Sequence, residues 1–164
     1  MYKLLDTASR QVNAATTILG CICALVMALA LLAGVFYRYV LNASLSWTDE
    51  VALLAFSWTV FLFASVLVRE QLHVRITLVV DLLPASFRAM LERLSIVLVM
   101  VFGVLMLGAG WQFTAFTAHQ VSPALRYPLW LQGSAVPVSG ALILLHALPL
   151  LIRARISEEQ GAEA

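Results

Sequence analysis

Four long uncharged apolar runs constrain the fold of this chain more than any other feature of its sequence. A helix needs about 20 mostly apolar residues to cross the hydrocarbon core of a bilayer, and even the shortest run, residues 51–68, contains no Asp, Glu, Lys or Arg. Only 12% of the 164 residues are charged, against about a quarter in soluble domains. We therefore expect an all-α integral membrane protein with four transmembrane helices at residues 12–37, 48–68, 91–117 and 129–152.

The N-terminal run predicts a retained helix and not a cleaved signal peptide. Lys3 and Arg10 are typical of the basic start of a signal peptide, and Ala28 and Ala30 are typical of its small-residue cleavage site. The apolar run continues well past that site, however, and is longer than the apolar segment of a signal peptide. We expect a single membrane domain, residues 1–156, followed by a polar, acidic tail at 157–164.

The basic residues are distributed unevenly among the connections between the predicted spans. Eight of the ten Lys and Arg residues precede the first span, separate the second from the third, or follow the fourth: Lys3, Arg10, Arg69, Arg75, Arg88, Arg93, Arg153 and Arg155. Only Arg38 and Arg126 lie in the other two connections. Because basic residues favour the cytoplasmic side of a membrane, this pattern predicts both termini inside and the loops 38–47 and 118–128 outside.

The segment between the second and third spans predicts a short helix lying in the plane of the membrane surface. An apolar stripe at helical spacing runs along it, formed by Leu72, Ile76, Val79, Val80 and Leu83. The polar residues lie largely off this stripe, as in helices that lie in the interface, and the same pattern also suits a plain amphipathic connector. Pro84 then favours a break, with a new helix beyond it.

The first outer loop groups charged and aromatic residues between two apolar runs. Ser46 precedes the second span and Asp49 follows three residues later, which is the spacing of a helix-capping box. Asp49 and Glu50 suit the positive end of that helix, and Trp47 suits the headgroup layer. Arg38 ends the first span, so we expect it to pair with these two carboxylates. Such pairing predicts either a brace within the chain or a contact with a partner protein.

Small residues recur along the predicted spans at helical spacing. In lipid, small residues allow helix backbones to approach closely. The candidates for such packing are Gly20, Ala24 and Ala28 in the first span, Gly103 and Gly110 in the third, and Gly140 in the fourth. The pattern predicts either packing among the four helices of this chain or packing on a larger partner, and the sequence leaves both open.

The sequence lacks the residues that enzymes and autonomous carriers place within a membrane. Ionisable residues inside a span are functional candidates, and the uncharged runs contain only two histidines, His119 and His146. These lie toward opposite faces of the membrane, whereas a haem-binding bundle needs axial histidines at one depth. Cys21 and Cys23 point to different faces of a helix, so we expect structural roles. We predict no enzyme activity and no cofactor or metal site. The net charge of +1 gives no basic field for nucleic acid.

Three segments in a fixed order resemble the small membrane (DctQ-like) subunit of tripartite ATP-independent periplasmic transporters, or TRAP transporters. They are RYVLNASLSWTDE from Arg38, REQLHVRITLVVDLLP from Arg69, and SPALRYPLWLQGSAVPVSGALILLHAL from Ser122. The resemblance covers roughly residues 35–148. It adds His73, Arg75 and Trp130 to Arg38, Ser46, Trp47, Asp49 and Glu50 as candidate structural or interface residues.

The resemblance implies a multi-pass subunit of a larger assembly in the bacterial inner membrane. Its expected partners are membrane lipid, a large multi-span permease subunit that holds the solute and sodium sites, and a periplasmic solute-binding protein that delivers a small organic acid. Uptake would be driven by an ion gradient, and this chain would scaffold the large subunit without binding solute. The residues alone leave a second interpretation open, a small anchor or assembly subunit of a membrane redox complex.

Overall fold

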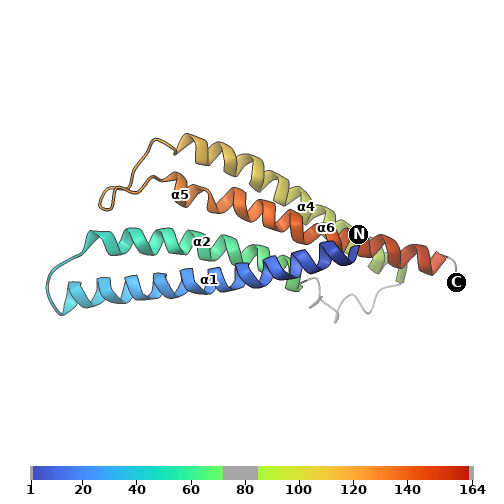
Figure 1. Ribbon diagram of the computed structural model, residues 1–164, viewed down its shortest axis with the longest axis horizontal. Helices are drawn as coiled ribbons and strands as arrows, with labels where there is room; N and C mark the ends of the chain where they lie inside the picture. The colour runs from blue at the N-terminus through green and yellow to red at the C-terminus, as the bar shows by residue number, and fades with distance from the viewer. Residues whose placement is uncertain (1, 72–84, 163–164) are drawn as a thin grey trace.

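A computed structural model describes residues 2–71 and 85–162 of the chain. It contains four long helices, α1 (Tyr2–Tyr39), α2 (Ser46–Gln71), α4 (Ala85–Phe116) and α6 (Ala135–Ala162), and a single-turn helix, α5 (Trp130–Gly133), directly before α6 (Figure 1). Four stretches are long and apolar enough to cross a membrane, at residues 9–39, 46–70, 93–116 and 130–151. The predicted all-α architecture with four membrane-spanning helices is therefore confirmed.

The helices form two antiparallel hairpins that pack side by side in the order α1, α2, α6, α4 (Figure 1). Both termini lie at one end of the bundle, which we call the terminal end (Figure 1). The connections 40–45 and 117–129 lie at the other end, which we call the loop end. A chain with four spans must have both termini at the same end of the bundle. The side of the membrane that each end faces remains a prediction.

The turn between α1 and α2 explains why the first helix stops where it does. Asn42 adopts a left-handed backbone conformation with φ 50°, which asparagine tolerates better than most residues. The chain then reverses, and the Ala43 N–H donates to the Tyr37 carbonyl at 3.0 Å. This bond satisfies one of the carbonyl groups that a helix end leaves without an intrahelical partner.

Glycines allow α4 and α6 to approach closely. A Cβ atom built on Gly140 would lie 2.7 Å from the Leu107 backbone nitrogen and 2.8 Å from the Gly103 carbonyl oxygen. A Cβ atom on Gly110 would meet Pro137 at 2.8 Å. Gly103, Gly110 and Gly140 therefore pack against other helices of the same chain.

The predicted small-residue stripe on α1 leaves the buried face before it reaches Ala28. Gly20 packs against the Phe63 ring of α2, and Ala24 is half-buried, but Ala28 is exposed and Ala30 is buried in its place. With 3.6 residues per turn, each step of four residues rotates the side chain by about 40° beyond a full turn. A strict four-residue repeat therefore drifts off one face of a straight helix within three steps.

The fourth span runs over residues 130–151, close to the 129–152 that the sequence predicted. Helix α5 ends at Gly133 and α6 begins at Ala135, but Ser134 between them keeps helical dihedrals, and its N–H donates to the Trp130 carbonyl at 2.8 Å. Pro137 has no N–H, so it cannot donate to the Gly133 carbonyl four residues earlier. One turn before, the Ser134 hydroxyl donates to the Leu131 carbonyl, and the Trp58 indole of α2 donates to the same oxygen at 3.0 Å.

The remaining boundaries differ from expectation in one place. The described part of α4 begins at Ala85, and the break predicted at Pro84 lies outside the described residues. Helix α6 continues to Ala162 and so takes in most of the polar tail predicted at 157–164, because Glu, Gln and Ala are favourable helix residues. The predicted surface helix, together with His73 and Arg75, lies outside the described residues.

Candidate functional site at the loop end

An ion pair joins the end of α1 to the first turn of α2. The Arg38 guanidinium lies 3.5 Å from the Asp49 carboxylate, and the two side chains are 53% and 61% exposed. A pair exposed to this degree contributes only about 0–1 kcal/mol when it faces water. The pair lies on the surface of the bundle.

Glu50 makes a different contact from the one predicted. Its carboxylate oxygens accept hydrogen bonds from the backbone N–H groups of Ala124 and Leu125, at 2.7 and 2.8 Å. Asp49 and Glu50 are adjacent in a helix and thus point about 100° apart. One carboxylate faces Arg38 and the other faces the second loop. The expectation that both carboxylates pair with Arg38 is corrected accordingly.

The second loop is a small hairpin held by its own backbone. The Ser122 N–H donates to the Tyr127 carbonyl and the Leu129 N–H donates to the Gln120 carbonyl, both at 2.9 Å. Arg126 lies at the turn with φ 56°, a left-handed conformation that is uncommon outside glycine and asparagine. The turn directs two successive N–H groups at Glu50, which provides the negative charge that this arrangement binds well.

A chain of side-chain hydrogen bonds links the second loop to α2. The Tyr127 hydroxyl donates to the Gln132 side-chain oxygen at 3.2 Å, and the Gln132 amide donates to the Ser57 hydroxyl at 3.1 Å. Burial, together with the charge of Glu50, raises the pKa of Tyr127 above its usual value. Tyr127 therefore keeps its hydroxyl proton at neutral pH and remains a donor. These contacts were not predicted from the sequence. The only sequence feature that pointed to them was the polar amide of Gln132 within the apolar run of the fourth span.

Thr48, and not Ser46, makes the local contacts at the start of α2. Ser46 is the first residue of α2 and is exposed. The Thr48 hydroxyl donates to the Leu45 carbonyl at 2.8 Å, and Thr48 is 1% exposed. Thr48 packs where Gly34 of α1 has no side chain, since a Cβ atom there would lie 2.9 Å from the Thr48 oxygen. The capping box expected of Ser46 and Asp49 is replaced by this packing.

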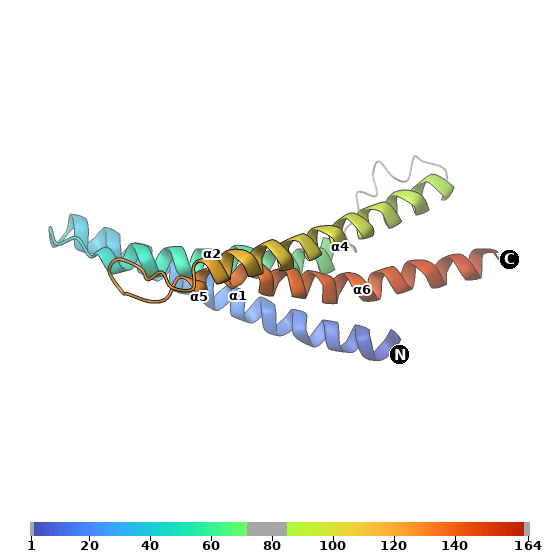
Figure 2. The same cartoon turned by 90° about the horizontal axis from the view of Figure 1, so that it is seen from above.

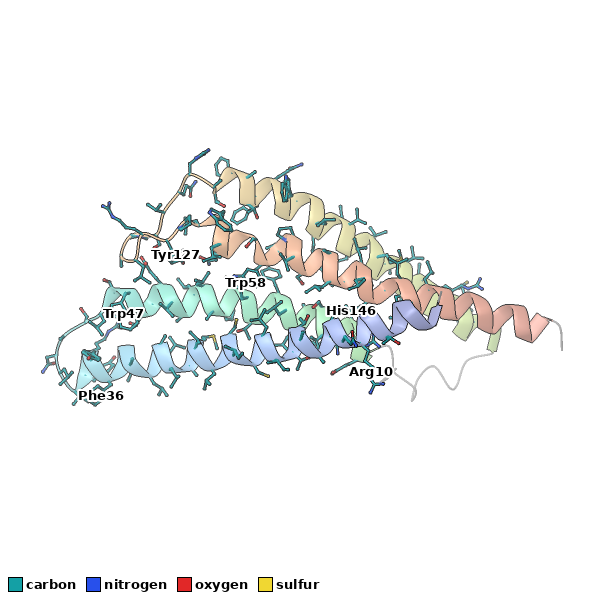
Figure 3. All side chains as sticks on the ribbon, in the orientation of Figure 1. Arg10, Phe36, Trp47, Trp58, Tyr127 and His146 are labelled. Carbon is teal, nitrogen blue, oxygen red and sulfur yellow. The ribbon has the colours of Figure 1, made fainter. Side chains whose placement is uncertain are left out.

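The aromatic candidates lie at the loop end without defining a pocket. Trp47 is 41% exposed near the start of α2, and Trp130 is 45% exposed at the start of α5. Figure 3 shows Trp47, Phe36 and Tyr127 near the same end of the bundle. This distribution suits anchoring at a membrane interface.

One partly open cavity of about 200 Å³ lies between α2, α4 and the α5–α6 segment. Its walls include Phe61, Phe113 and Val136, and its polar lining residues are Ser57, Thr117 and Gln132. No Lys, Arg or His lines it, so it offers no cation to an anionic solute. Within residues 2–71 and 85–162, no group of three or more His, Cys, Asp or Glu side chains could hold a metal ion.

Comparison with known proteins identifies the family. Residues 27–156 match the family described as "Tripartite ATP-independent periplasmic transporters, DctQ component". A Haemophilus influenzae protein named "Putative TRAP transporter small permease protein" is 28% identical over 132 residues, which cover 80% of this chain and 82% of that protein. This match therefore covers about four fifths of each of the two chains.

Two further relatives are longer than this chain. The Vibrio cholerae "C4-dicarboxylate TRAP transporter small permease protein DctQ" is 24% identical over 119 residues, 73% of this chain and 48% of that protein. The matched segment thus spans about half the length of that relative. The Oleidesulfovibrio alaskensis "Isethionate TRAP transporter permease protein DctMQ" is 30% identical over 112 residues, 65% of this chain and 17% of that protein. The bundle described here belongs to the DctQ component family of tripartite ATP-independent periplasmic transporters.

Proposed function

We propose that this chain is the small permease subunit of a sodium-driven TRAP transporter for organic acids, and that it supports a large permease subunit without binding solute itself. The observation that carries the proposal is the family match over residues 27–156. It favours this function over the anchor subunit of a redox complex. The names of the relatives, which mention C4-dicarboxylate and isethionate, support an organic anion as the solute.

The interior of the bundle supports a non-binding role. An organic acid taken from water needs a cationic or hydrogen-bonding site, because burial of an unpaired carboxylate is costly. The cavity between α2, α4 and α5–α6 has no basic lining residue. Ionisable residues within spans usually mark a transport path, and residues 51–68 and 94–118 contain none of Asp, Glu, Lys, Arg or His.

A large partner is supported by the O. alaskensis relative. Its name contains DctMQ, and the part that matches this chain is only 17% of its length. A segment like this bundle is therefore continuous with a much longer permease chain in that protein. We propose that this chain meets a separate large subunit through its own apolar helix faces and works with a periplasmic solute-binding protein in the bacterial inner membrane.

Reconstitution tests the division of labour. Proteoliposomes containing this chain alone should take up no C4-dicarboxylate or isethionate under an inward sodium gradient. Uptake should appear when the large permease and the solute-binding protein are added, and it should disappear when potassium replaces sodium. Sodium-driven uptake by the chain alone would contradict the proposal.

Reporter fusions test the orientation. A periplasmic enzyme fused after Ser44 or Ala124, at the loop end, should be active. A cytoplasmic fluorescent reporter fused before Ala85, at the start of α4, should be fluorescent. The reverse pattern would show that the loop end faces the cytoplasm and that the positive-inside assignment is wrong.

A further inference from the structure

A buried polar cluster at the terminal end joins three helices. The Ser9 hydroxyl of α1 lies 2.8 Å from Nδ1 of His146 on α6. The Arg69 guanidinium of α2 donates to the same Ser9 oxygen. Ser9 is 0% exposed and His146 is 1% exposed. His146, one of the two histidines in the uncharged runs, is enclosed within the bundle (Figure 3).

The hydrogen bonds around Ser9 accommodate a His146 imidazole that carries its proton on Nε2. Arg69 can only donate, so the Ser9 oxygen is its acceptor. The Ser9 hydroxyl proton is then free to point at His146 Nδ1, which lies 2.8 Å away. A neutral imidazole that accepts at one nitrogen carries its proton on the other. In this arrangement His146 Nε2 is an N–H donor, and it is buried without a hydrogen-bond partner among the described residues.

A second unpaired atom lies close by on α1. The Asn13 side-chain oxygen Oδ1 is buried without a partner in the described part of the chain. Asn13 is four residues after Ser9, so both side chains lie on the same face of α1. The cluster therefore contains one orphan donor, on His146, and one orphan acceptor, on Asn13, which lies about one helical turn from Ser9.

The helix directions favour an approach of the two side chains. Side chains in a helix lean toward its N-terminus, and α1 and α6 run in opposite directions (Figure 1). Side chains at facing positions of α1 and α6 therefore lean toward one another along the bundle axis.

We propose that one buried water molecule bridges His146 Nε2–H and Asn13 Oδ1. The water accepts from the imidazole and donates to the amide oxygen, which gives it the two polar partners that a buried water needs at minimum. Without it, two buried polar atoms would remain unsatisfied, which is costly in a low-dielectric interior.

The bridge completes a polar lock that extends from Arg69 through Ser9, His146 and the water to Asn13. The lock ties α1 to both α2 and α6 at the terminal end. Figure 2 shows α1 and α6 separating toward their terminal ends. Polar contacts between helices are a common means of association in lipid, where the hydrophobic effect contributes little.

Solid-state NMR of the full chain in lipid bilayers, labelled with ¹⁵N-histidine, tests the proposal. His146→Gln assigns the His146 signals by their disappearance. We expect the neutral Nε2–H form of His146 and rapid magnetisation transfer from water to Nε2, although the ring is buried. A His146 ring protonated at Nδ1, or an Nε2 proton that receives nothing from water, would overturn the proposal from the wild-type spectrum alone.

Two variants locate the second partner of the water. Asn13→Leu should abolish the transfer from water to His146 Nε2 while the Nε2–H form persists. Gln11→Leu replaces an exposed amide on the same helix and should leave the transfer unchanged. Equal transfer in wild type and Asn13→Leu would show that Asn13 does not hold the water. A direct contact between His146 Nε2 and Asn13 without water transfer would also refute the bridge.

Discussion

Replacement of Gly140 by alanine tests whether α4 and α6 depend on backbone contact. The new Cβ would lie 2.7 Å from the Leu107 nitrogen and 2.8 Å from the Gly103 oxygen, whereas ordinary contact begins at 3.4 Å. The two helices must therefore separate locally by about 0.6–0.7 Å, because backbone atoms of a helix cannot move individually.

The size of the effect follows from two opposing contributions. Overpacking of a close contact costs about 1–3 kcal/mol, while replacing glycine by alanine within a helix gains up to about 1 kcal/mol. We expect Gly140→Ala to lower the free energy of unfolding by about 1–2 kcal/mol. Denaturation of the isolated chain by SDS in mixed micelles, followed by tryptophan fluorescence, measures this difference.

Two other glycines provide matched controls. A Cβ atom on Gly108 of α4 would have nothing within 4 Å, so Gly108→Ala should be neutral or stabilising by up to about 1 kcal/mol. A Cβ atom on Gly20 would meet only the Phe63 ring, at 3.1 Å, and a ring can shift, so Gly20→Ala should lie between the two. If Gly140→Ala unfolds like wild type or like Gly108→Ala, the close α4–α6 contact is refuted.

Three further predictions concern polar contacts. Arg38→Glu should reduce assembly with the large subunit or uptake by a small factor, as measured by co-purification and uptake. The double variant Arg38→Glu, Asp49→Arg should recover part of that loss, whereas the double variant Arg38→Glu, Glu50→Arg should not. Glu50→Gln should increase hydrogen exchange at the amides of Ala124 and Leu125, while Asp49→Asn leaves it unchanged; equal exchange in both would contradict the assigned contacts. Ser139→Ala, which removes a hydrogen bond from α6 to the Phe61 carbonyl of α2, should destabilise the chain by about 0.6 kcal/mol, whereas Ser95→Ala, whose hydroxyl bonds within α4, should not.

The membrane spans were predictable because their signal is local and additive. Hydropathy and length alone place four spans, and the structure has stretches that can cross a membrane at residues 9–39, 46–70, 93–116 and 130–151. Which helix faces pack on each other was harder to predict, for a geometric reason. A four-residue repeat marked Ala28 as a packing candidate, but helical drift leaves it exposed in this bundle, so packing of Ala28 on a partner stays a prediction.

The role of Glu50 was beyond the reach of sequence reasoning for a different reason. Its partners are backbone N–H groups at Ala124 and Leu125, and every residue except proline carries such a group. No residue type therefore marks a loop that will aim two of them at a carboxylate. Arg38 and Asp49 were easier to pair because both partners are charged side chains close in sequence. Opposite charge within a hairpin is a pattern that a sequence displays directly.

The separation of Asp49 and Glu50 also changes how the loop end should be regarded. Asp49 connects α2 to α1 through Arg38, and Glu50 connects α2 to the loop before α5. The first turn of α2 therefore joins both hairpins, and neither outer loop can shift without affecting it. Because an exposed ion pair is weak and charge-assisted bonds to two N–H groups are stronger, the connection through Glu50 should outlast the one through Asp49. A partner protein that contacts both outer loops would then find the loop 117–129 held more firmly than the loop 40–45.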